Sequence, residues 1–283
     1  MECKQCRLIR LEPRPTPAEL KKYYPSGYWY APSDDPSAKL EEAYRRFVLR
    51  DHINFALRAY EELGEKGLVV DVGCGGGLFA RMLRERGAPI LGLDNSPEAA
   101  KIAWKNNGVA VVCGDFASSP IARGACAMVT MFHVIEHVYD PVAYLRTARD
   151  LLRPGGRLIL QAPNASSWQF LVFGEYWNGI DVPRHLVDYR QKDLENLLDY
   201  CGFDVVRRKH FSLRDNPAGF ASSVVPSLDP MARRVRRIHE SRAVKWLKDI
   251  LYFGILAASL PFTILEATCG AGSTIMLEAR KKD

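Results

Sequence analysis

The middle of the chain alternates short apolar runs with segments whose apolar residues repeat at helical spacing. The runs are rich in β-branched residues and bounded by Gly, Pro or Asp, which is typical of buried strands. Helix starts are marked at Ser96-Pro97 and Asp140-Pro141, where an N-cap residue precedes a proline. Such alternation predicts a mostly parallel sheet covered by helices. We predict strands at 68–72, 89–94, 110–114, 127–132, 156–162, 204–210 and 273–279, and helices starting near 78, 96, 141 and 192.

Two flanking regions do not follow this alternation. Tyr23–Tyr30 carries five aromatics in eight residues, which either cap a core or cover a substrate, and 40–63 is patterned as an amphipathic helix. The long insertion before the last strand holds a basic run at 231–237 and an apolar stretch at 250–265. A spanning helix needs about 20 apolar residues. Because this stretch is shorter and Pro261 interrupts it, we predict a buried or interfacial helix pair.

The pattern therefore divides the chain into four consecutive segments. We expect an N-terminal extension and helix that covers the substrate, an α/β core, a helical insertion and a last core strand. Basic residues beside an apolar helical face also fit contact with a membrane surface, and the alternative is that this face packs on the domain. The expected boundaries are 1–66, 67–211, 212–271 and 272–283.

Composition says more about the cellular compartment of the protein than about any reaction that it catalyses. A net charge of +6 and a pI near 8.9 are compatible with an anionic partner but do not establish one. Seven cysteines, among them Cys113, Cys126 and Cys201 in apolar segments, indicate reduced, buried thiols. The first 20 residues lack the apolar core of a signal peptide, so we expect a cytoplasmic protein. Cys3 and Cys6 have no second pair nearby, and no metal is expected.

The candidate chemistry begins at the glycine-rich turn Gly73–Gly77, directly after a strand. Backbone N–H groups exposed there are a usual place to hold an adenosine-containing ligand. Asp71 would repel a pyrophosphate, which argues against a nicotinamide dinucleotide and for a ligand with a positive centre. Asp94, about 20 residues after the glycines, can accept ribose hydroxyls. Asp115 can accept from an adenine amino group, and Phe116 can stack on the ring.

These motifs together resemble class I S-adenosylmethionine-dependent methyltransferases, in the branch that includes the ubiquinone-biosynthesis O-methyltransferases. The matching segments are 70–77, 92–94, 114–116, 136–138 and 151–156. The resemblance implies a Rossmann-like sheet of seven strands with the last strand antiparallel. It also implies S-adenosyl-L-methionine as methyl donor and S-adenosyl-L-homocysteine as product. The cofactor-binding residues that it implies are Asp71, Gly73, Cys74, Gly75, Asp94, Asn95, Asp115, Phe116, Phe132 and His133.

One sub-branch of the family carries Trp-x-Gly-x-x-x-Pro-Arg-His-Leu, seen here at Trp177–Leu186. Members of this sub-branch often begin with a zinc module, of which only Cys3 and Cys6 remain in this chain. The residues expected to bind the methyl acceptor are Tyr24, Tyr28, Trp177, Asp181, Arg184 and His185.

Three histidines are candidates for the base that removes a proton from an acceptor hydroxyl: His133, His137 and His185. Asp181, four residues before His185, is placed to orient it. His133 and His137 are four residues apart with Glu136 between them, so a shared helical face would also let them bind a metal. The alternative for these two histidines is a structural hydrogen bond or a cofactor contact.

The sequence predicts methyl transfer to a small-molecule acceptor, with an oxygen of a hydrophobic or lipid-like metabolite as the favoured target. The rivals are an RNA methyltransferase that uses the arginine run and a non-catalytic protein that binds S-adenosylmethionine. No nucleic-acid partner is expected, because no separate RNA-binding module is evident. Peripheral membrane contact through 231–265 remains a further hypothesis.

Overall fold

The computed structural model describes residues 1–25, 28–29, 36–236, 238 and 240–282. Ser26, Gly27 and Tyr30 of the predicted aromatic segment lie outside the described residues. The chain forms two compact units, and this division differs from the four consecutive segments expected from the sequence. One unit contains 1–28, 163–191 and 209–275; the other, which we call the sheet unit, contains 29–162, 192–208 and 276–283.

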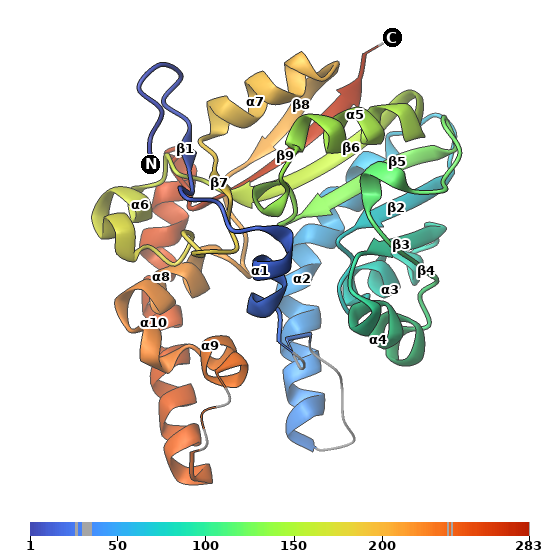
Figure 1. Ribbon diagram of the computed structural model, residues 1–283. Helices are drawn as coiled ribbons and strands as arrows, with labels where there is room; N and C mark the ends of the chain where they lie inside the picture. The colour runs from blue at the N-terminus through green and yellow to red at the C-terminus, as the bar shows by residue number, and fades with distance from the viewer. Residues whose placement is uncertain (26–27, 30–35, 237, 239, 283) are drawn as a thin grey trace. The chain divides into compact units, whose positions relative to one another are not determined.

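The seven-stranded sheet has the order β4-β3-β2-β5-β6-β9-β8, which confirms the predicted fold class. Strands β4, β3, β2, β5 and β6 run parallel to one another (Figure 1). Each predicted strand is present with ends shifted by at most a few residues. The bounds are β2 Leu68–Val72, β3 Ile90–Asp94, β4 Val111–Cys113, β5 Cys126–Phe132, β6 Leu152–Pro163, β8 Phe203–Lys209 and β9 Thr274–Lys281.

The last strand runs antiparallel to its neighbours, as expected. Near the end of β9, Lys281 Nζ donates to the carbonyl of Leu152, at the start of β6. The next residue, Lys282, donates its backbone N–H to Gly202, just before β8. The end of β9 therefore lies beside the starts of both flanking strands.

Helices of the sheet unit begin where the sequence places their caps. Ser96 Oγ accepts from the backbone N–H of Ala99 at 3.2 Å, and Asp140 Oδ1 accepts from that of Ala143 at 2.9 Å. Helices α2 and α3 pack with β2, β5, β6 and β9 in one hydrophobic core. The bounds are α2 Pro36–Glu61, α3 Leu78–Arg84, α4 Pro97–Asn107, α5 Pro141–Leu151 and α7 Gln191–Tyr200, with 3₁₀ turns η2 Phe116–Ser118 and η3 Ile135–His137.

The unit of residues 1–28, 163–191 and 209–275, which we call the helical unit, consists mainly of helices. Helices α8 and α10 pack around Ala221, Leu228 and Tyr252. A two-stranded antiparallel sheet joins β1 to β7. The bounds are β1 Ile9–Arg10, α1 Pro17–Leu20, η1 Lys21–Tyr23, α6 Trp168–Phe173, η4 Gly174–Tyr176, β7 Val187–Asp188, α8 Asn216–Val224, η5 Pro226–Leu228, α9 Pro230–Val235 and α10 Arg242–Thr268.

The prediction that Pro261 interrupts the apolar stretch 250–265 is wrong. Helix α10 is a single helix of 27 residues, Arg242–Thr268, that includes Pro261, so the expected helix pair does not form. Proline removes one backbone donor from a helix, and here Tyr252 before it and Glu266 after it hold the two parts of α10 against other helices. By length and composition, this helix is long and apolar enough to cross a membrane.

The cysteine prediction holds in part. All seven cysteines are free thiols, and Cys126 and Cys201 are buried as expected. Cys113 is exposed at the end of β4, because that strand is at the edge of the sheet.

Candidate functional site

Asp71 is a buried carboxyl group inside β2. It is 3% exposed, and its Oδ1 accepts a hydrogen bond from Thr130 Oγ1 of the adjacent strand β5 at 2.7 Å. Burial raises the pKa of Asp71 to about 7, and the nearby Asp94 acts in the same direction. A carboxyl group with this pKa is sensitive to a cation placed beside it, because the cation favours its ionised form.

The glycine turn that follows β2 needs glycine for its backbone conformation. Gly73 and Gly75 have φ angles of 69° and 53°, in the left-handed region that favours glycine. Gly92 of the neighbouring strand leaves room for this turn, since a Cβ there would lie 2.7 Å from Cys74 Sγ. The buried Cys74 thus packs the turn against β3, and burial raises the pKa of its thiol.

Asp94 connects the glycine turn to the end of β3. Its Oδ2 accepts from the backbone N–H of Gly75 at 2.9 Å, and its Oδ1 accepts from that of Ser96 at 2.8 Å. Burial raises the pKa of Asp94, while the two backbone hydrogen bonds act in the opposite direction. Each carboxylate oxygen has a second lone pair that can accept a ribose hydroxyl. The neighbouring Asn95 is exposed at the same strand end.

Asp115 lies after β4, where its carboxylate is exposed and accepts a hydrogen bond from Tyr144 Oη at 2.6 Å. Burial raises the pKa of Tyr144, and this hydrogen bond adds to the shift. Phe116 is fully buried, with its ring centroid 5.5 Å from that of Tyr144. A fully buried ring offers no open face to a ligand, so in this structure Phe116 packs beneath Asp115 instead of forming a stacking platform.

Trp29, for which no specific role was predicted, covers the glycine turn. A Cβ added to Gly75 would lie 2.9 Å from Trp29 Cζ3, so the indole ring lies directly against the turn. Trp29 Nε1 donates to Ser96 Oγ at 3.1 Å. The ring therefore spans the two loops that follow β2 and β3.

His133 is held by hydrogen bonds on both sides of its ring. It has φ 56°, with Nδ1 3.1 Å from Glu136 Oε1 and Nε2 3.0 Å from Gln161 Nε2. Because a carboxylate accepts and an amide nitrogen donates, Nδ1 carries the proton and Nε2 accepts. This arrangement fits the structural alternative for His133.

The α-helix that the metal hypothesis requires does not form between His133 and His137. His137 ends the 3₁₀ turn η3, which begins only at Ile135. The two imidazoles therefore do not share one face of an α-helix. Phe132, immediately before His133, contacts the rings of His52 and Phe79 and takes part in packing the core.

The residues at this end of the sheet fit S-adenosyl-L-methionine. Strands β4, β3 and β2 are neighbours, and Asp115, Asp94 and the glycine turn all lie at their carboxyl ends. Ligands of open α/β sheets bind at that edge. The buried Asp71 supplies negative charge suited to a cation, and the carboxylates of Asp94 and Asp115 supply hydrogen-bond acceptors. These acidic groups together match a cationic adenosyl compound.

In the helical unit, four predicted acceptor-binding residues form one cluster. The Arg184 guanidinium lies 5.0 Å from the ring centroid of Tyr28 and 5.9 Å from that of Tyr24. Arg184 also forms an ion pair with Asp181 at 2.8 Å. Burial raises the pKa of Tyr28, and the positive charge of Arg184 opposes that shift. The cluster combines aromatic faces with a positive charge, as in cation–π recognition sites.

His185 is buried in the same unit, and the carboxylate of Asp181 does not orient its ring. That carboxylate binds Arg184, whereas Nδ1 of His185 lies 2.9 Å from the carbonyl oxygen of Gly179. A carbonyl only accepts, so Nδ1 carries the proton and Nε2 is the basic nitrogen. Trp177 is 2% exposed and packs on Gly179, where a Cβ would lie 2.3 Å from its ring. Trp177 therefore supports the loop that holds His185.

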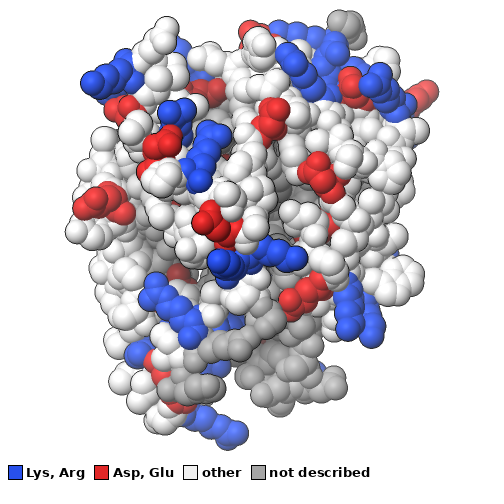
Figure 2. All heavy atoms as spheres, in the orientation of Figure 1, with Lys and Arg blue, Asp and Glu red and all other residues white. Residues whose placement is uncertain are grey.

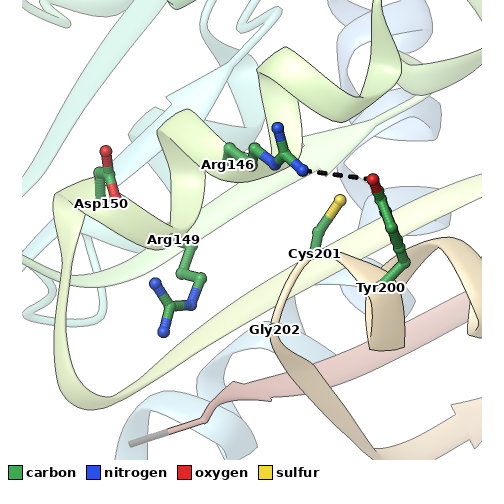
Figure 3. Close-up of a pocket in the computed structure, with 6 residues that line it drawn as sticks. All are labelled: Arg146, Arg149, Asp150, Tyr200, Cys201 and Gly202. Atoms are coloured by element: carbon green, nitrogen blue, oxygen red, sulfur yellow. Dashed lines mark hydrogen bonds between the residues drawn. The ribbon is translucent and has the colours of Figure 1, made fainter.

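A separate pocket of about 320 Å³ lies between α5 and the turn from α7 to β8 (Figure 3). Arg146 and Tyr200 from opposite sides of it are joined by a hydrogen bond of 3.5 Å. It is close to the starts of β6 and β8, and the glycine turn follows the carboxyl end of β2. This pocket is therefore not part of the candidate cofactor site.

Several residues of the site have no distinctive sequence signal. Thr130, Tyr144 and Gln161 contact the predicted residues from other strands and helices. Such tertiary neighbours follow no fixed spacing in the chain. Ser96 was recognised only as a helix cap, although it also binds Trp29.

A family model described as a methyltransferase domain matches residues 40–208, more than half of the chain. Among curated proteins, a ubiquinone biosynthesis O-methyltransferase of Cereibacter sphaeroides is 32% identical over 155 residues, covering 50% of this chain and 62% of that protein. One of the same description from Ralstonia nicotianae is 29% identical over 182 residues, covering 61% and 73%. The match thus spans less than two thirds of the length of the former relative.

Solved structures with the same fold cover most of the chain at low identity. A putative sarcosine dimethylglycine methyltransferase from Galdieria sulphuraria has a TM-score of 0.57 at 17% identity, covering 90% of this chain and 93% of that one. A SAM-dependent methyltransferase from Archaeoglobus fulgidus has a TM-score of 0.55 at 19% identity, covering 87% and 100%. At these identities the likeness concerns the fold alone.

Proposed function

Since this chain belongs to the methyltransferase domain family, we propose that it transfers the methyl group of S-adenosyl-L-methionine to an oxygen of a hydrophobic, lipid-like small molecule. The observation that carries the proposal is the alignment of Asp71, Asp94 and Asp115 with the glycine turn at the ends of three adjacent strands. The cofactor brings the sulfonium that releases the methyl group, and S-adenosyl-L-homocysteine is the product.

The residues of the sheet unit hold the donor in this proposal. Asp94 accepts the ribose hydroxyls, Asp115 accepts from the adenine amino group, and Asp71 in its ionised form balances the positive charge. The glycine turn lets the methionine part approach the backbone. In-line transfer depends mainly on alignment, so rigid support of these groups is their main contribution.

His185 is the base that we assign to the acceptor hydroxyl. Its Nδ1 is fixed by the carbonyl of Gly179, which directs the basic Nε2 away from that bond. Arg184, with Tyr24 and Tyr28, would contact the acceptor through a positive charge and two aromatic faces. His133 stabilises the strand end and is not assigned a proton-transfer role.

The acceptor class rests on two observations of different kinds. The curated relatives are described as ubiquinone biosynthesis O-methyltransferases, which favours an oxygen acceptor with an apolar tail. The helical unit of this chain also exposes large apolar side chains on α10. Both favour a lipid-like metabolite over a polar one.

Arg233, in the arginine run 231–237, does not support the rival RNA methyltransferase. Arg233 is buried and forms ion pairs with Glu240 and Asp249. Arg233 is thus used inside the fold and is not presented to phosphates.

The proposal is tested by incubating the protein with methyl-labelled S-adenosylmethionine and a cell extract divided into organic-soluble metabolites and total RNA. We expect label in an organic-soluble product whose mass increases by one methylene group. The Asp94→Asn variant, weakened in donor binding, is the matched control and should give much less product. Label in RNA alone, or no label in either fraction, would contradict the proposal.

A further inference from the structure

Helix α10 is attached to its own unit by polar residues. Its buried positions are Tyr252, Ser259, Thr263 and Glu266, which follow one another at spacings of seven, four and three and so share one face. Tyr252 Oη lies 3.2 Å from Ser222 Oγ of α8. Glu266 Oε1 accepts from Gln169 Nε2 of α6 at 2.7 Å. The helix is therefore fixed at both ends of this polar face.

Some apolar side chains of α10, such as Ile255 and Leu256, pack against α8, but many others point toward the surface. An amphipathic surface helix normally buries its apolar face. In α10 the most apolar 18-residue window has a mean hydropathy of 1.7, yet only 22% of it is buried. Apolar patches of this kind mark interaction sites. The exposed members are Val244, Trp246, Leu247, Ile250, Leu251, Phe253, Ile264 and Leu265, with relative exposures of 42–64%.

Exposed positive charges lie near the N-terminal end of α10. Arg236, Arg242 and Lys245 are exposed, whereas Lys248 is paired with Glu240. Figure 2 shows Lys and Arg side chains at the lower left, over the region of α9 and the first part of α10. An apolar helical face beside cations matches the surface of an anionic bilayer.

We propose that the outward face of α10, from Val244 to Leu265, lies in the interface of an anionic lipid bilayer, with the helix axis parallel to the membrane. The apolar side chains enter the boundary between headgroups and acyl chains, and the exposed cations contact lipid phosphates. Membrane binding stands on these observations alone. Its role in delivering a lipid-like acceptor rests on the proposed function.

Two features favour a helix that lies on the membrane over one that crosses it. The polar face is bound to α8 and α6 along its length, and a crossing would break those contacts. It would also place Glu266 within the hydrocarbon, at a large cost for an ionisable group.

A second copy of the chain is a less suitable occupant for this face. A twofold contact pairs the same patch on both copies. It would therefore bring the cations of one copy close to those of the other.

The test is co-sedimentation of the full chain with vesicles of phosphatidylcholine, alone or mixed with phosphatidylglycerol. We expect binding to the mixed vesicles that weakens with added salt, together with a blue shift of the emission of Trp246. Leu247→Glu and Ile250→Glu should each reduce vesicle binding about tenfold or more. The matched control is Trp104→Glu in the sheet unit, a side chain with the same 64% exposure as Trp246, which should bind as the unmodified protein does.

The charge contribution is measured separately with Arg242→Gln and Lys245→Gln. Each should lower binding to the mixed vesicles about fivefold at low salt, with no effect on phosphatidylcholine alone. Binding of S-adenosylhomocysteine by every variant reports that the fold is retained.

Equal vesicle binding by the α10 variants and the Trp104 control would overturn the inference. A dimer that Ile250→Glu dissociates, without vesicle binding by the unmodified protein, would also overturn it and assign the face to a second copy. Methyl transfer to a detergent-dispersed acceptor separates the two proposals. Transfer without vesicle binding contradicts only this inference, and vesicle binding without transfer contradicts only the proposed function.

Discussion

The indole ring of Trp29 lies against Gly75, at a distance where a Cβ on the glycine would come within 2.9 Å of the ring. The same ring donates a hydrogen bond to Ser96, the cap of α4. A residue far from the glycine turn in the chain thus closes the space between the loops that hold the candidate cofactor. This contact gives the first testable prediction.

Replacing Trp29 with alanine should weaken S-adenosylhomocysteine binding about tenfold, because the ring shields the hydrogen bonds of Asp94 from water. Titration calorimetry measures the affinity, and ligand-dependent tryptophan fluorescence should disappear in Trp29→Phe. The exposed Trp104 is the control, and Trp104→Phe should retain the signal. A gain in affinity for Trp29→Ala would instead mean that the ring competes with the ligand.

Tyr144→Phe should weaken binding of adenosyl ligands about three- to tenfold. The hydroxyl of Tyr144 holds the Asp115 carboxylate at 2.6 Å, and without it that side chain has more freedom at an exposed position. Calorimetry with S-adenosylhomocysteine measures the loss. Tyr200→Phe removes a hydroxyl at the pocket of Figure 3 and should leave affinity unchanged. Equal losses in both variants would argue against a positioning role for Tyr144.

Binding of S-adenosylmethionine should strengthen as pH rises from about 5.5 to 7.5, because the pKa of Asp71 is raised to about 7 and only its ionised form attracts the cation. Asp71→Asn should bind about 30-fold or more weakly at pH 7.5 and show a flatter pH profile. Titrations at several pH values measure both effects. A profile with the same slope in the variant would exclude Asp71 as its source.

Asp71 should have the opposite effect on the stability of the fold, which should weaken as pH rises. The pKa of Asp71 is higher in the folded chain than its ordinary value of 3.8, so folding favours the protonated form. Its contribution to stability is fully present below the ordinary value and is lost as pH rises through about 7. Asp71→Asn, which keeps an oxygen for Thr130, should therefore melt about 2–4 °C higher than the unmodified protein at pH 8. Thermal unfolding at pH 5 and pH 8 measures this, and an equal difference at both pH values would contradict it.

His185→Ala should reduce turnover about 100-fold or more while leaving S-adenosylhomocysteine affinity unchanged, because a base acts only on the acceptor. Labelled methyl transfer and calorimetry on the same preparation separate the two effects. His210, hydrogen-bonded to Gln191 at 2.7 Å and outside the segment 177–186, is the matched control. Turnover that survives in His185→Ala would remove this residue from the proposed chemistry.

The elements that were predicted correctly are those in which local pattern and tertiary packing agree. Both ends of strand β2 were predicted correctly, because a β-branched run before a glycine turn favours both a strand and burial. The full length of helix α10 was not predicted, because a proline signals a local break in a helix. Contacts of Tyr252 and Glu266 with other helices hold its whole length together.

The fold class, the glycine turn and the acids that end successive strands could all be predicted from the chain alone. These features depend on backbone conformation and strand order, which leave regular traces along the chain. The folded chain was needed to show that Trp29 covers the turn, that Tyr144 holds Asp115, that Phe116 is a core residue, and that α10 exposes many apolar side chains. These contacts join residues distant in the chain, so they depend on packing and have no characteristic spacing.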